Sequence, residues 1–247
     1  MKADCENIKP YHGKHDSSKR EEVREMFDNI APKYDFMNRA MTFGLDNSWR
    51  NKAIRKVADS GSKKVLDIAC GTGDMAIKMA KSIPGISITG IDLSPKMLEE
   101  GRRKVEREHL QERIVLIEGD SLALPFDDES FDAITVAFGV RNFENLEKGY
   151  REMCRVLKRH GLLIVLELST PQGALTGAAY RFYTKYLIPL AGKMISGDSR
   201  AYSYLPESIA AVPQREGMSS LIKASGFSDV SYSEMTFGTC SLYVGRK

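Results

Sequence analysis

Cysteine is scarce in this chain of 247 residues, and its four copies are scattered. They are Cys5, Cys70, Cys154 and Cys240, with no CxxC pair and no histidine nearby at metal-ligand spacing. Zinc sites and disulfide frameworks need cysteines at characteristic spacings. We therefore expect a protein that binds no metal, forms no disulfides and works in a reducing compartment.

Long hydrophobic runs and a strong excess of one charge are absent as well. No uncharged apolar stretch approaches the roughly 18–20 residues of a transmembrane helix, and the polar residues 1–20 contain no signal peptide. The 36 Lys and Arg residues against 33 Asp and Glu leave a net charge of +3. So weak an excess does not indicate a nucleic-acid partner. These absences predict a cytoplasmic protein that binds no nucleic acid.

What the chain does contain is a regular alternation of short apolar runs and helical periods. The apolar runs cover residues 64–69, 86–91, 113–117, 131–137 and 162–166. Residues with helical spacing follow the first, second and fourth of these runs. Strands that alternate with helices predict a doubly wound, mostly parallel α/β sheet of Rossmann-like type, covered on both faces.

The segments outside this alternation complete the predicted organisation. Residues 1–18 lack periodicity and are expected to form a mobile tail before a single domain over residues 19–247. Helical spacing in residues 23–57 predicts an N-terminal helical extension. An aromatic, Leu- and Ile-rich stretch predicts a helical insertion at about residues 174–200. Two runs around Gly238 and Thr239 predict a C-terminal β-hairpin.

A glycine-rich turn follows the first predicted strand. It reads Asp67-Ile-Ala-Cys-Gly71-Thr-Gly73-Asp74, and its glycines allow a tight turn and a close approach of a ligand to the backbone. Asp92, 19 residues after Gly73, ends the second strand, where a carboxylate can accept both hydroxyls of a ribose. Residues 71–76 also satisfy the GxGxxG/A pattern of dinucleotide-binding folds. The spacing alone therefore fits both NAD and S-adenosylmethionine (SAM).

Charge separates these two ligands. In a dinucleotide site the pyrophosphate lies over the helix N-terminus, where this chain has Asp74. A carboxylate about 4 Å from a phosphate costs on the order of 4 kcal/mol at an effective dielectric constant near 20. SAM has no phosphate and carries a sulfonium and an ammonium group, which carboxylates favour. The sequence therefore favours SAM over NAD.

A further ligand-binding point is predicted after the third strand. Asp120 can accept a hydrogen bond from the adenine amino group, and the Ser121 backbone N–H can reach a ring nitrogen. Each acid alone has a structural explanation, such as a helix cap at Asp74 or a turn at Asp92. Their order at successive strand ends favours a ligand site, because ligands bind at the carboxyl ends of such strands.

Blocks of sequence along the chain resemble a known family. Residues 65–74 with Asp92, Asp120-Ser121 and residues 124–126 look like a class I SAM-dependent methyltransferase. The blocks 27–38 (FDNIAPKYDFMN), 138–143 (FGVRNF) and 202–209 (YSYLPESI) resemble the UbiE/MenG/COQ5 family of quinone-biosynthesis C-methyltransferases. There are two departures. Residues 46–48 (DNS) precede Trp49 where many relatives have His-Arg, and Ala137 stands where many have Ser.

The resemblance implies an activity and a cofactor. It implies methylation of a ring carbon of a polyprenylated quinol, either demethylmenaquinol to menaquinol or the benzoquinol counterpart of the ubiquinone pathway. We lean to the menaquinone reaction. It also implies SAM as methyl donor, bound near Thr72, Asp92, Asp120 and Ser121, and Asp67, Gly71 and Gly73 complete the predicted cofactor set.

Three residues are candidates for the chemistry at the quinol, and Tyr34 joins the predicted cofactor set. Arg141 can polarise a quinol oxygen or orient a water that takes the ring proton, and Asn142 can fix the hydroxyl. The alternative for Arg141 is a buried pair with an acid such as Glu144 or Glu167. Asp35 is a weaker candidate for the base, and Tyr34 is expected to close over the methionine end of SAM.

Other functions and partners remain open from the sequence. The alternatives are a SAM methyltransferase acting on another small molecule or on RNA, a SAM-binding regulator without turnover, and an NAD-dependent oxidoreductase. The aromatic stripe of residues 174–196 is either core or an apolar channel for a prenyl tail. Basic residues Arg181, Lys185 and Lys193 interrupt it, which suits transient peripheral contact with the inner face of a membrane. A homodimer is left open.

Overall fold

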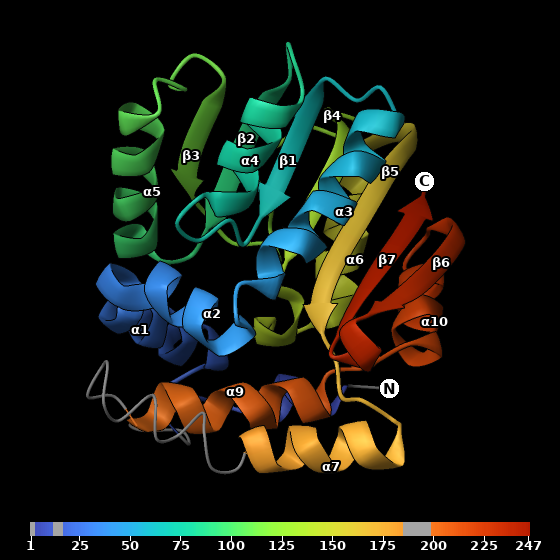
Figure 1. The fold of residues 1–247 in the computed structure, drawn as a ribbon. Helices are drawn as coiled ribbons and strands as arrows, with labels where there is room; N and C mark the ends of the chain where they lie inside the picture. The colour runs from blue at the N-terminus through green and yellow to red at the C-terminus, as the bar shows by residue number, and fades with distance from the viewer. Residues whose placement is uncertain (1–2, 12–16, 185–198) are drawn as a thin grey trace.

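A computed structural model describes residues 3–11, 17–184 and 199–247 of the chain (Figure 1). Its centre is a seven-stranded sheet in the order β3-β2-β1-β4-β5-β7-β6. The strands are β1 (Lys64–Ile68), β2 (Ser87–Asp92), β3 (Ile114–Glu118), β4 (Phe131–Ala137), β5 (Leu157–Leu168), β6 (Ser228–Met235) and β7 (Cys240–Arg246). The first five are parallel, whereas β7 runs antiparallel to β5 and β6. The predicted mostly parallel sheet and its closing hairpin are confirmed.

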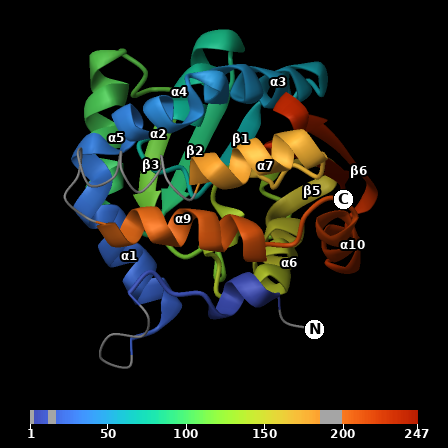
Figure 2. The same cartoon turned by 60° about the horizontal axis from the view of Figure 1, so that its bottom comes forward.

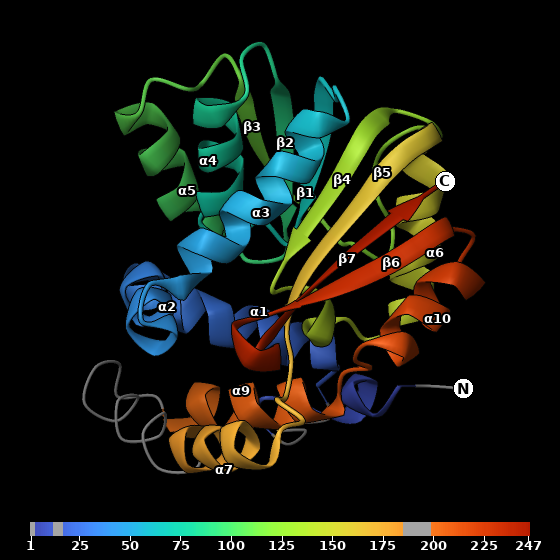
Figure 3. The same cartoon turned by 45° about the vertical axis from the view of Figure 1, so that its right-hand side comes forward.

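Successive residues of the central strands face opposite layers of helices. In β5, Leu162, Ile164 and Leu166 belong to one hydrophobic core, while Leu163 and Val165 belong to the other. The first core packs against α3 (Leu45–Asp59), α4 (Asp74–Ser82) and α5 (Pro95–Arg107), and the second against α6 (Leu146–Val156) and α10 (Glu216–Ala224). Figure 3 shows the two layers on opposite sides of the sheet. Because both faces are buried, these strands are continuous apolar runs rather than alternating ones.

The strand order reverses at β1, which lies between β2 and β4. From β1 the chain builds β2 and β3 on one side, and then returns to build β4 and β5 on the other. Ligands of such sheets bind outside the carboxyl ends of the strands at this point. Four helices lie across that edge, as Figure 2 shows. They are α1 (Lys19–Ile30), α2 (Tyr34–Thr42), α7 (Ala174–Phe182) and α9 (Ser199–Ala211).

The N-terminal segment is attached to the domain. Residues Asp4–Asn7 form a 3-10 helix, and Cys5 is fully buried in the second core. The buried Lys19 ammonium donates hydrogen bonds to the carbonyls of Cys5 at 2.7 Å, Arg141 at 2.9 Å and Phe143 at 3.1 Å. Residues 3–11 therefore differ from the mobile tail expected over residues 1–18. Their contacts are with distant residues, and local sequence periodicity does not report such contacts.

The predicted helical insertion at about residues 174–200 is described only in part. Helix α7 forms its beginning and α9 starts at its end. Residues 185–198, with the predicted basic positions Lys185 and Lys193, lie outside the described residues. None of the helices in the described ranges is long and apolar enough to cross a membrane.

Candidate active site

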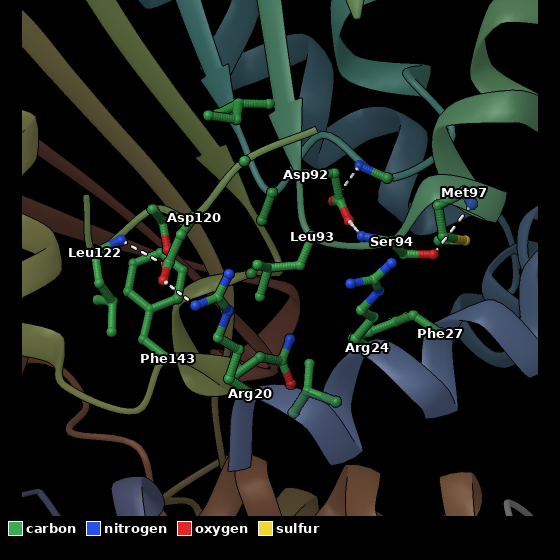
Figure 4. A pocket seen from close by; sticks show the side chains of 18 of the residues that line it. Arg20, Arg24, Phe27, Asp92, Leu93, Ser94, Met97, Asp120, Leu122 and Phe143 are labelled. Atoms are coloured by element: carbon green, nitrogen blue, oxygen red, sulfur yellow. Dashed lines mark hydrogen bonds and ion pairs between the residues drawn. The ribbon is translucent and has the colours of Figure 1, made fainter. Parts of the chain in front are cut away.

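A cavity of about 70 Å³ lies at the carboxyl ends of the central strands, and we call it the strand-end cavity (Figure 4). Its wall combines residues from the turn after β1, the end of β2, the loop after β3 and the loop after β4. The sequence-predicted residues that line it are Tyr34, Gly71, Asp92, Asp120, Ser121 and Asn142. The structure thus brings together residues that the sequence places at successive strand ends.

Asp92 is held by two backbone donors. The Gly71 N–H donates to its Oδ2 at 2.8 Å, and the Ser94 N–H donates to its Oδ1 at 2.9 Å (Figure 4). Burial raises the pKa of this carboxyl, and the two N–H bonds oppose that shift. The carboxylate is therefore fixed at the cavity wall, and each of its oxygens can accept a further hydrogen bond.

Asp120 points toward α1. Its Oδ2 lies 3.2 Å from Arg20 Nη1, and its Oδ1 accepts a hydrogen bond from the Leu122 N–H at 2.8 Å (Figure 4). Arg20 and Arg24 both line the strand-end cavity, one helical turn apart on α1. Sequence reasoning missed both arginines. Their i, i+4 spacing on an amphipathic helix was the only available signal, and many solvent-exposed helices show the same spacing.

The turn between β1 and α4 approaches the cavity through its backbone. Gly71 and Gly73 have φ values of 54° and 75°, which residues with side chains rarely adopt. A Cβ added at Gly71 would lie 3.2 Å from the Met97 side chain. The two glycines are therefore required by conformation, and Gly71 also by its neighbours.

Asp67 is a buried acid that is only half satisfied. The Thr135 hydroxyl donates to its Oδ1 at 2.6 Å, while its buried Oδ2 has no hydrogen-bond partner among the described residues. Burial raises the pKa of this carboxyl to about 7. Asp67 lines a recess of about 20 Å³ under the glycine turn, together with Thr72 and Asp74. The recess therefore offers an unpaired carboxylate oxygen to a cationic group.

Lys104 of α5 connects the glycine turn to α2. Its ammonium donates to Asp35 Oδ2 at 2.7 Å, to Thr72 Oγ1 at 3.1 Å and to Asp74 Oδ1, and the Thr72 hydroxyl donates to Asp35 Oδ1 at 2.6 Å. Burial would raise the pKa of Asp74, but the pKa is lowered overall by Lys104, with smaller contributions from Arg50 and Arg39. The charge argument from Asp74 against a phosphate is therefore weaker than the sequence suggests, since Lys104 neutralises that acid. In the described part of the chain, Asp35 lines neither the strand-end cavity nor the larger cavity beside it.

That larger cavity, of about 410 Å³, lies under α7 and α9, and we call it the apolar cavity. Its wall comes from α2, α3, α7, α9 and the turn between β6 and β7. Apolar and aromatic side chains predominate, among them Met41, Phe43, Leu45, Trp49, Phe138, Leu168, Ala179, Tyr180, Leu205, Ile209 and Phe237. A flat aromatic ring with a hydrocarbon tail fits such a lining.

Arg141 lines the apolar cavity and is also part of a buried ion pair. Its Nη1 lies 2.7 Å from Glu167 Oε1 and also donates to the Phe138 carbonyl. Its Nε is buried without a hydrogen-bond partner in the described ranges. The pairing with Glu167 anticipated from sequence is present, and that with Glu144 is not seen among the described residues. Arg141 therefore pairs with Glu167 and lines the apolar cavity at the same time.

Asn142 and Tyr34 both line the strand-end cavity, and Tyr34 also lines the apolar cavity. The Tyr204 hydroxyl of α9 donates to Asn142 Oδ1 at 3.0 Å. Tyr34 lines the strand-end cavity, the recess and the apolar cavity. Burial raises the pKa of its hydroxyl, so the tyrosine is neutral at physiological pH. The strand-end cavity and the apolar cavity therefore share the rings of Tyr34 and Phe138 as wall.

A sequence profile of the ubiE/COQ5 methyltransferase family matches residues 15–247. The chain belongs to this family. A demethylmenaquinone methyltransferase from Bacteroides fragilis is 46% identical over 242 residues, which cover 98% of each chain. Another from Deinococcus radiodurans is 42% identical over 243 residues, covering 98% of this chain and 99% of the relative. A ubiquinone/menaquinone biosynthesis C-methyltransferase UbiE from Geotalea daltonii is 40% identical over 232 residues, covering 94% of this chain and 98% of the relative.

Solved structures confirm the fold. A SAM-dependent methyltransferase from Thermotoga maritima superimposes with a TM-score of 0.65 at 18% identity, covering 91% of this chain and 99% of that one. The [4+2]-cyclase SpnF superimposes with a TM-score of 0.70 at 18% identity, covering 92% and 96%. The ubiE/COQ5 chain therefore has the class I methyltransferase fold expected from its sequence, and is a SAM-dependent methyltransferase. The NAD-dependent alternative is wrong.

Proposed function

We propose that this ubiE/COQ5-family chain transfers a methyl group from SAM to a ring carbon of demethylmenaquinol, giving menaquinol. The observation that carries the proposal is the junction at Tyr34. There, a cavity lined by carboxylates meets an apolar cavity of about 410 Å³. A methyl transfer between a cationic donor and a lipid quinol needs these two environments side by side.

The residues of the strand-end cavity and the recess fit SAM. Asp92 is positioned to accept the ribose hydroxyls, and Asp120 with Ser121 to bind the adenine edge. The buried Oδ2 of Asp67, which has no partner in the described structure, suits the ammonium group of the methionine moiety. Gly71, Thr72 and Gly73 let the backbone pass close to that moiety. SAM supplies an electrophilic methyl group on a sulfonium.

On the quinol side the protein orients the ring. Asn142 accepts from Tyr204 through Oδ1, which leaves its amide N–H groups as the donors for a quinol hydroxyl in this proposal. Arg141, held by Glu167, is positioned to polarise a quinol oxygen and to orient the water that takes the ring proton. Alignment of two reactants contributes up to roughly 7–11 kcal/mol in well-oriented systems. Placement is therefore the main contribution of these residues.

Asp35 has a role in holding the site together in this proposal. Its two oxygens are occupied by Thr72 and Lys104. These contacts tie α2, and with it Tyr34, to the glycine turn. We therefore assign the role of base to a water beside Arg141 rather than to Asp35.

The choice of quinol follows the relatives. Those named demethylmenaquinone methyltransferase share 42–46% identity with this chain, and the benzoquinol of the ubiquinone pathway is the alternative. The test incubates the protein with labelled SAM and each demethylated quinol, followed by lipid extraction. We expect label in the menaquinol fraction. Label only in the benzoquinol product would support the alternative. Label in neither, from protein that binds SAM, would mean another small-molecule substrate.

We also propose that the mouth of the apolar cavity contacts a lipid bilayer, from which the quinol enters. Two exposed aromatic side chains line it, Phe43 at 78% and Phe237 at 82%, and α7, which also contributes to its wall, exposes Leu175 at 84% and Phe182 at 59%. Such a cluster is unusual on a protein surface that faces only water. Flotation with anionic liposomes tests this contact. We expect co-migration that falls when Phe43 and Phe237 are changed to Ser, and no co-migration of the unaltered protein would refute it.

A further inference from the structure

Arg50 is a buried cation whose guanidinium is incompletely paired. It extends from α3 and is 7% exposed. Its Nε lies 3.7 Å from Asp46 Oδ2, which is too long for a hydrogen bond, and nothing within the described residues accepts a hydrogen bond from that nitrogen. A buried charge with an unsatisfied donor is costly, so its position calls for an explanation.

The position of Arg50 links the two halves of the site. It lines both the apolar cavity and the recess that holds Asp67 and Asp74. Its guanidinium carbon lies 5.2 Å from the centre of the Phe138 ring, and Trp49 packs edge-on against that ring at 6.2 Å. The cation is therefore held at an aromatic wall of the substrate cavity, where little water competes for it.

The structure also explains why Asp46 does not satisfy Arg50. Asp46 is buried, and its Oδ1 accepts a hydrogen bond from the Thr42 hydroxyl at 3.0 Å. This bond orients the carboxylate and leaves it at ion-pair distance from Arg50. Asp46 therefore compensates the charge of Arg50 without using its donors.

Arg50 acts on the two acids of the recess through charge, since it acts to lower the pKa of both Asp67 and Asp74, but this leaves its hydrogen-bond donors unused. Asp74 already has an ion pair with Lys104. Asp67 has its pKa raised to about 7, so that much of it is uncharged at neutral pH. Neither acid accepts a hydrogen bond from Arg50 among the contacts that the structure describes. An anionic ligand atom can therefore take the free donors of Arg50, and in the apolar cavity that Arg50 lines this atom would belong to the quinol.

We propose that Arg50 binds one oxygen of the quinol as its phenolate, across the ring from the oxygen that Arg141 polarises. This inference rests on the proposed function and deepens it, since it assigns the ionisation state of the substrate. A phenol of the tyrosine type ionises near pH 10, and a cation at about 4–6 Å lowers such a pKa by roughly 1–3 units. Arg50 thereby makes the enzyme selective for aromatic rings with an ionisable hydroxyl.

Ionisation of the quinol serves the methyl transfer directly. The hydroxyl proton leaves to water, and the ring shares the resulting negative charge, which makes its unsubstituted carbon more nucleophilic. That carbon bonds to the methyl carbon as the methyl–sulfur bond breaks, and the electron pair of this bond stays on sulfur. The ring carbon then gives its proton to water, the ring becomes aromatic again, and the phenolate oxygen regains a proton from water on release. Overall one methyl group replaces one ring hydrogen, and no oxidant or reductant is needed.

The test measures the ionisation of a bound phenol rather than turnover. We use 1-naphthol, whose phenolate absorbs at longer wavelength than its neutral form and which withstands air better than a quinol. The SAM-saturated protein is titrated with base, and the pKa of bound naphthol is read from absorbance. We expect this pKa to lie one unit or more below that of free naphthol. In R50M it should return to the free value, and in R50K the shift should be partly retained.

Control variants separate this effect from misfolding and from net charge. R55M removes an exposed arginine of the same helix and should leave the naphthol pKa as in the unaltered protein. D46N/R50M removes both members of the buried pair, so no uncompensated Asp46 remains, and it should also abolish the shift. An unshifted pKa in the unaltered protein, absence of naphthol binding, or a full shift retained in R50M would each overturn the proposal. Failure of the proposed function appears separately, as protein that shifts naphthol ionisation but labels no quinol.

Discussion

The two cavities that meet at Tyr34 are built in opposite ways. The strand-end cavity is made from short turns that directly follow β1, β2, β3 and β4, and its key acid Asp92 is fixed by backbone N–H groups. The apolar cavity is made from helices outside the parallel sheet, with side chains as its wall. In the proposed function the donor site is thus part of the sheet, whereas the acceptor site lies under helices that cover the sheet edge.

This difference teaches where specificity lies in a ubiE/COQ5 chain. Backbone groups at strand ends suit the binding of SAM, a methyl donor shared by many methyltransferases. They are present whatever the side chains are, so the sequence around them can vary. The covering helices α2, α7 and α9 can vary without disturbing the sheet. Variants on the donor side should therefore change SAM binding alone, and variants on the acceptor side should change quinol handling alone.

The largest effect is expected from Asp92→Ala on the donor side. Hydrogen bonds to a charged acceptor contribute about 1.5–3 kcal/mol each. Loss of two ribose contacts should therefore raise the Kd for SAM roughly 10²–10⁴-fold by calorimetry. The exposed Asp127→Ala serves as control and should bind SAM normally. SAM affinity unchanged in D92A would remove Asp92 from the cofactor site.

Asp67→Asn should give the next largest effect, and it depends on pH. The pKa of Asp67 is raised to about 7, so its folded state favours the protonated carboxyl. That contribution to stability is complete below the unfolded pKa near 4 and is lost as pH rises through 7. Asn stays neutral, so the ligand-free variant should be more stable at pH 8 by up to about 4 kcal/mol. The gain should shrink as pH falls to 4, as urea unfolding would show.

SAM binding to the same variant gives the complementary measurement. An ammonium beside Asp67 favours the carboxylate, so the affinity of the unaltered protein for SAM should increase between pH 5 and pH 7. In Asp67→Asn the affinity should be weaker and should not follow this trend. If both proteins show the same pH dependence, Asp67 does not face the cofactor.

Sequence reasoning anticipated that the strand-end residues lie close together, and the reason is physical. Gly71, Gly73, Asp92 and Asp120 lie in turns whose position follows from the strands beside them, and the strands follow from apolar periodicity. Lys104 and Arg20 were missed, although they contact Asp74 and Asp120. Their contacts depend on how helices pack over the strand ends, which local pattern does not specify.

The acceptor side could not be predicted in the same way. Arg50 of α3 lines the apolar cavity, Tyr204 of α9 donates to Asn142, and Glu167 of β5 pairs with Arg141. These elements are far apart in the sequence and come together only in the folded chain. The aromatic stripe of residues 174–196 indicated an apolar element, but not which cavity it would cover. Arg141 is a further example. The sequence block around it could be recognised, but the sequence left two possible partners for it, Glu144 and Glu167.

On the acceptor side, Arg141→Lys should change the Kd for SAM by less than twofold and lower kcat about 10²-fold. The loss in kcat is of the size seen when one oriented hydrogen-bond donor to a reacting oxygen is removed. Arg141→Met additionally leaves Glu167 buried and unpaired, which costs about 3–5 kcal/mol of stability. The double variant R141M/E167Q should recover that stability without recovering kcat. Recovery of both would show that Arg141 acts only through folding.

The smallest effect is expected from Tyr204→Phe, and it tests how finely the cover positions the ring. The change removes only the hydroxyl that donates to Asn142 Oδ1 at 3.0 Å. A neutral hydrogen bond contributes about 0.5–1.5 kcal/mol, so KM for the quinol should rise roughly two- to tenfold while the Kd for SAM stays unchanged. Asn142 also lines the strand-end cavity, so a change at Tyr204 can reach the donor only through that amide. If Y204F weakens SAM binding as much as quinol binding, the two sites are coupled through Asn142 and do not act independently.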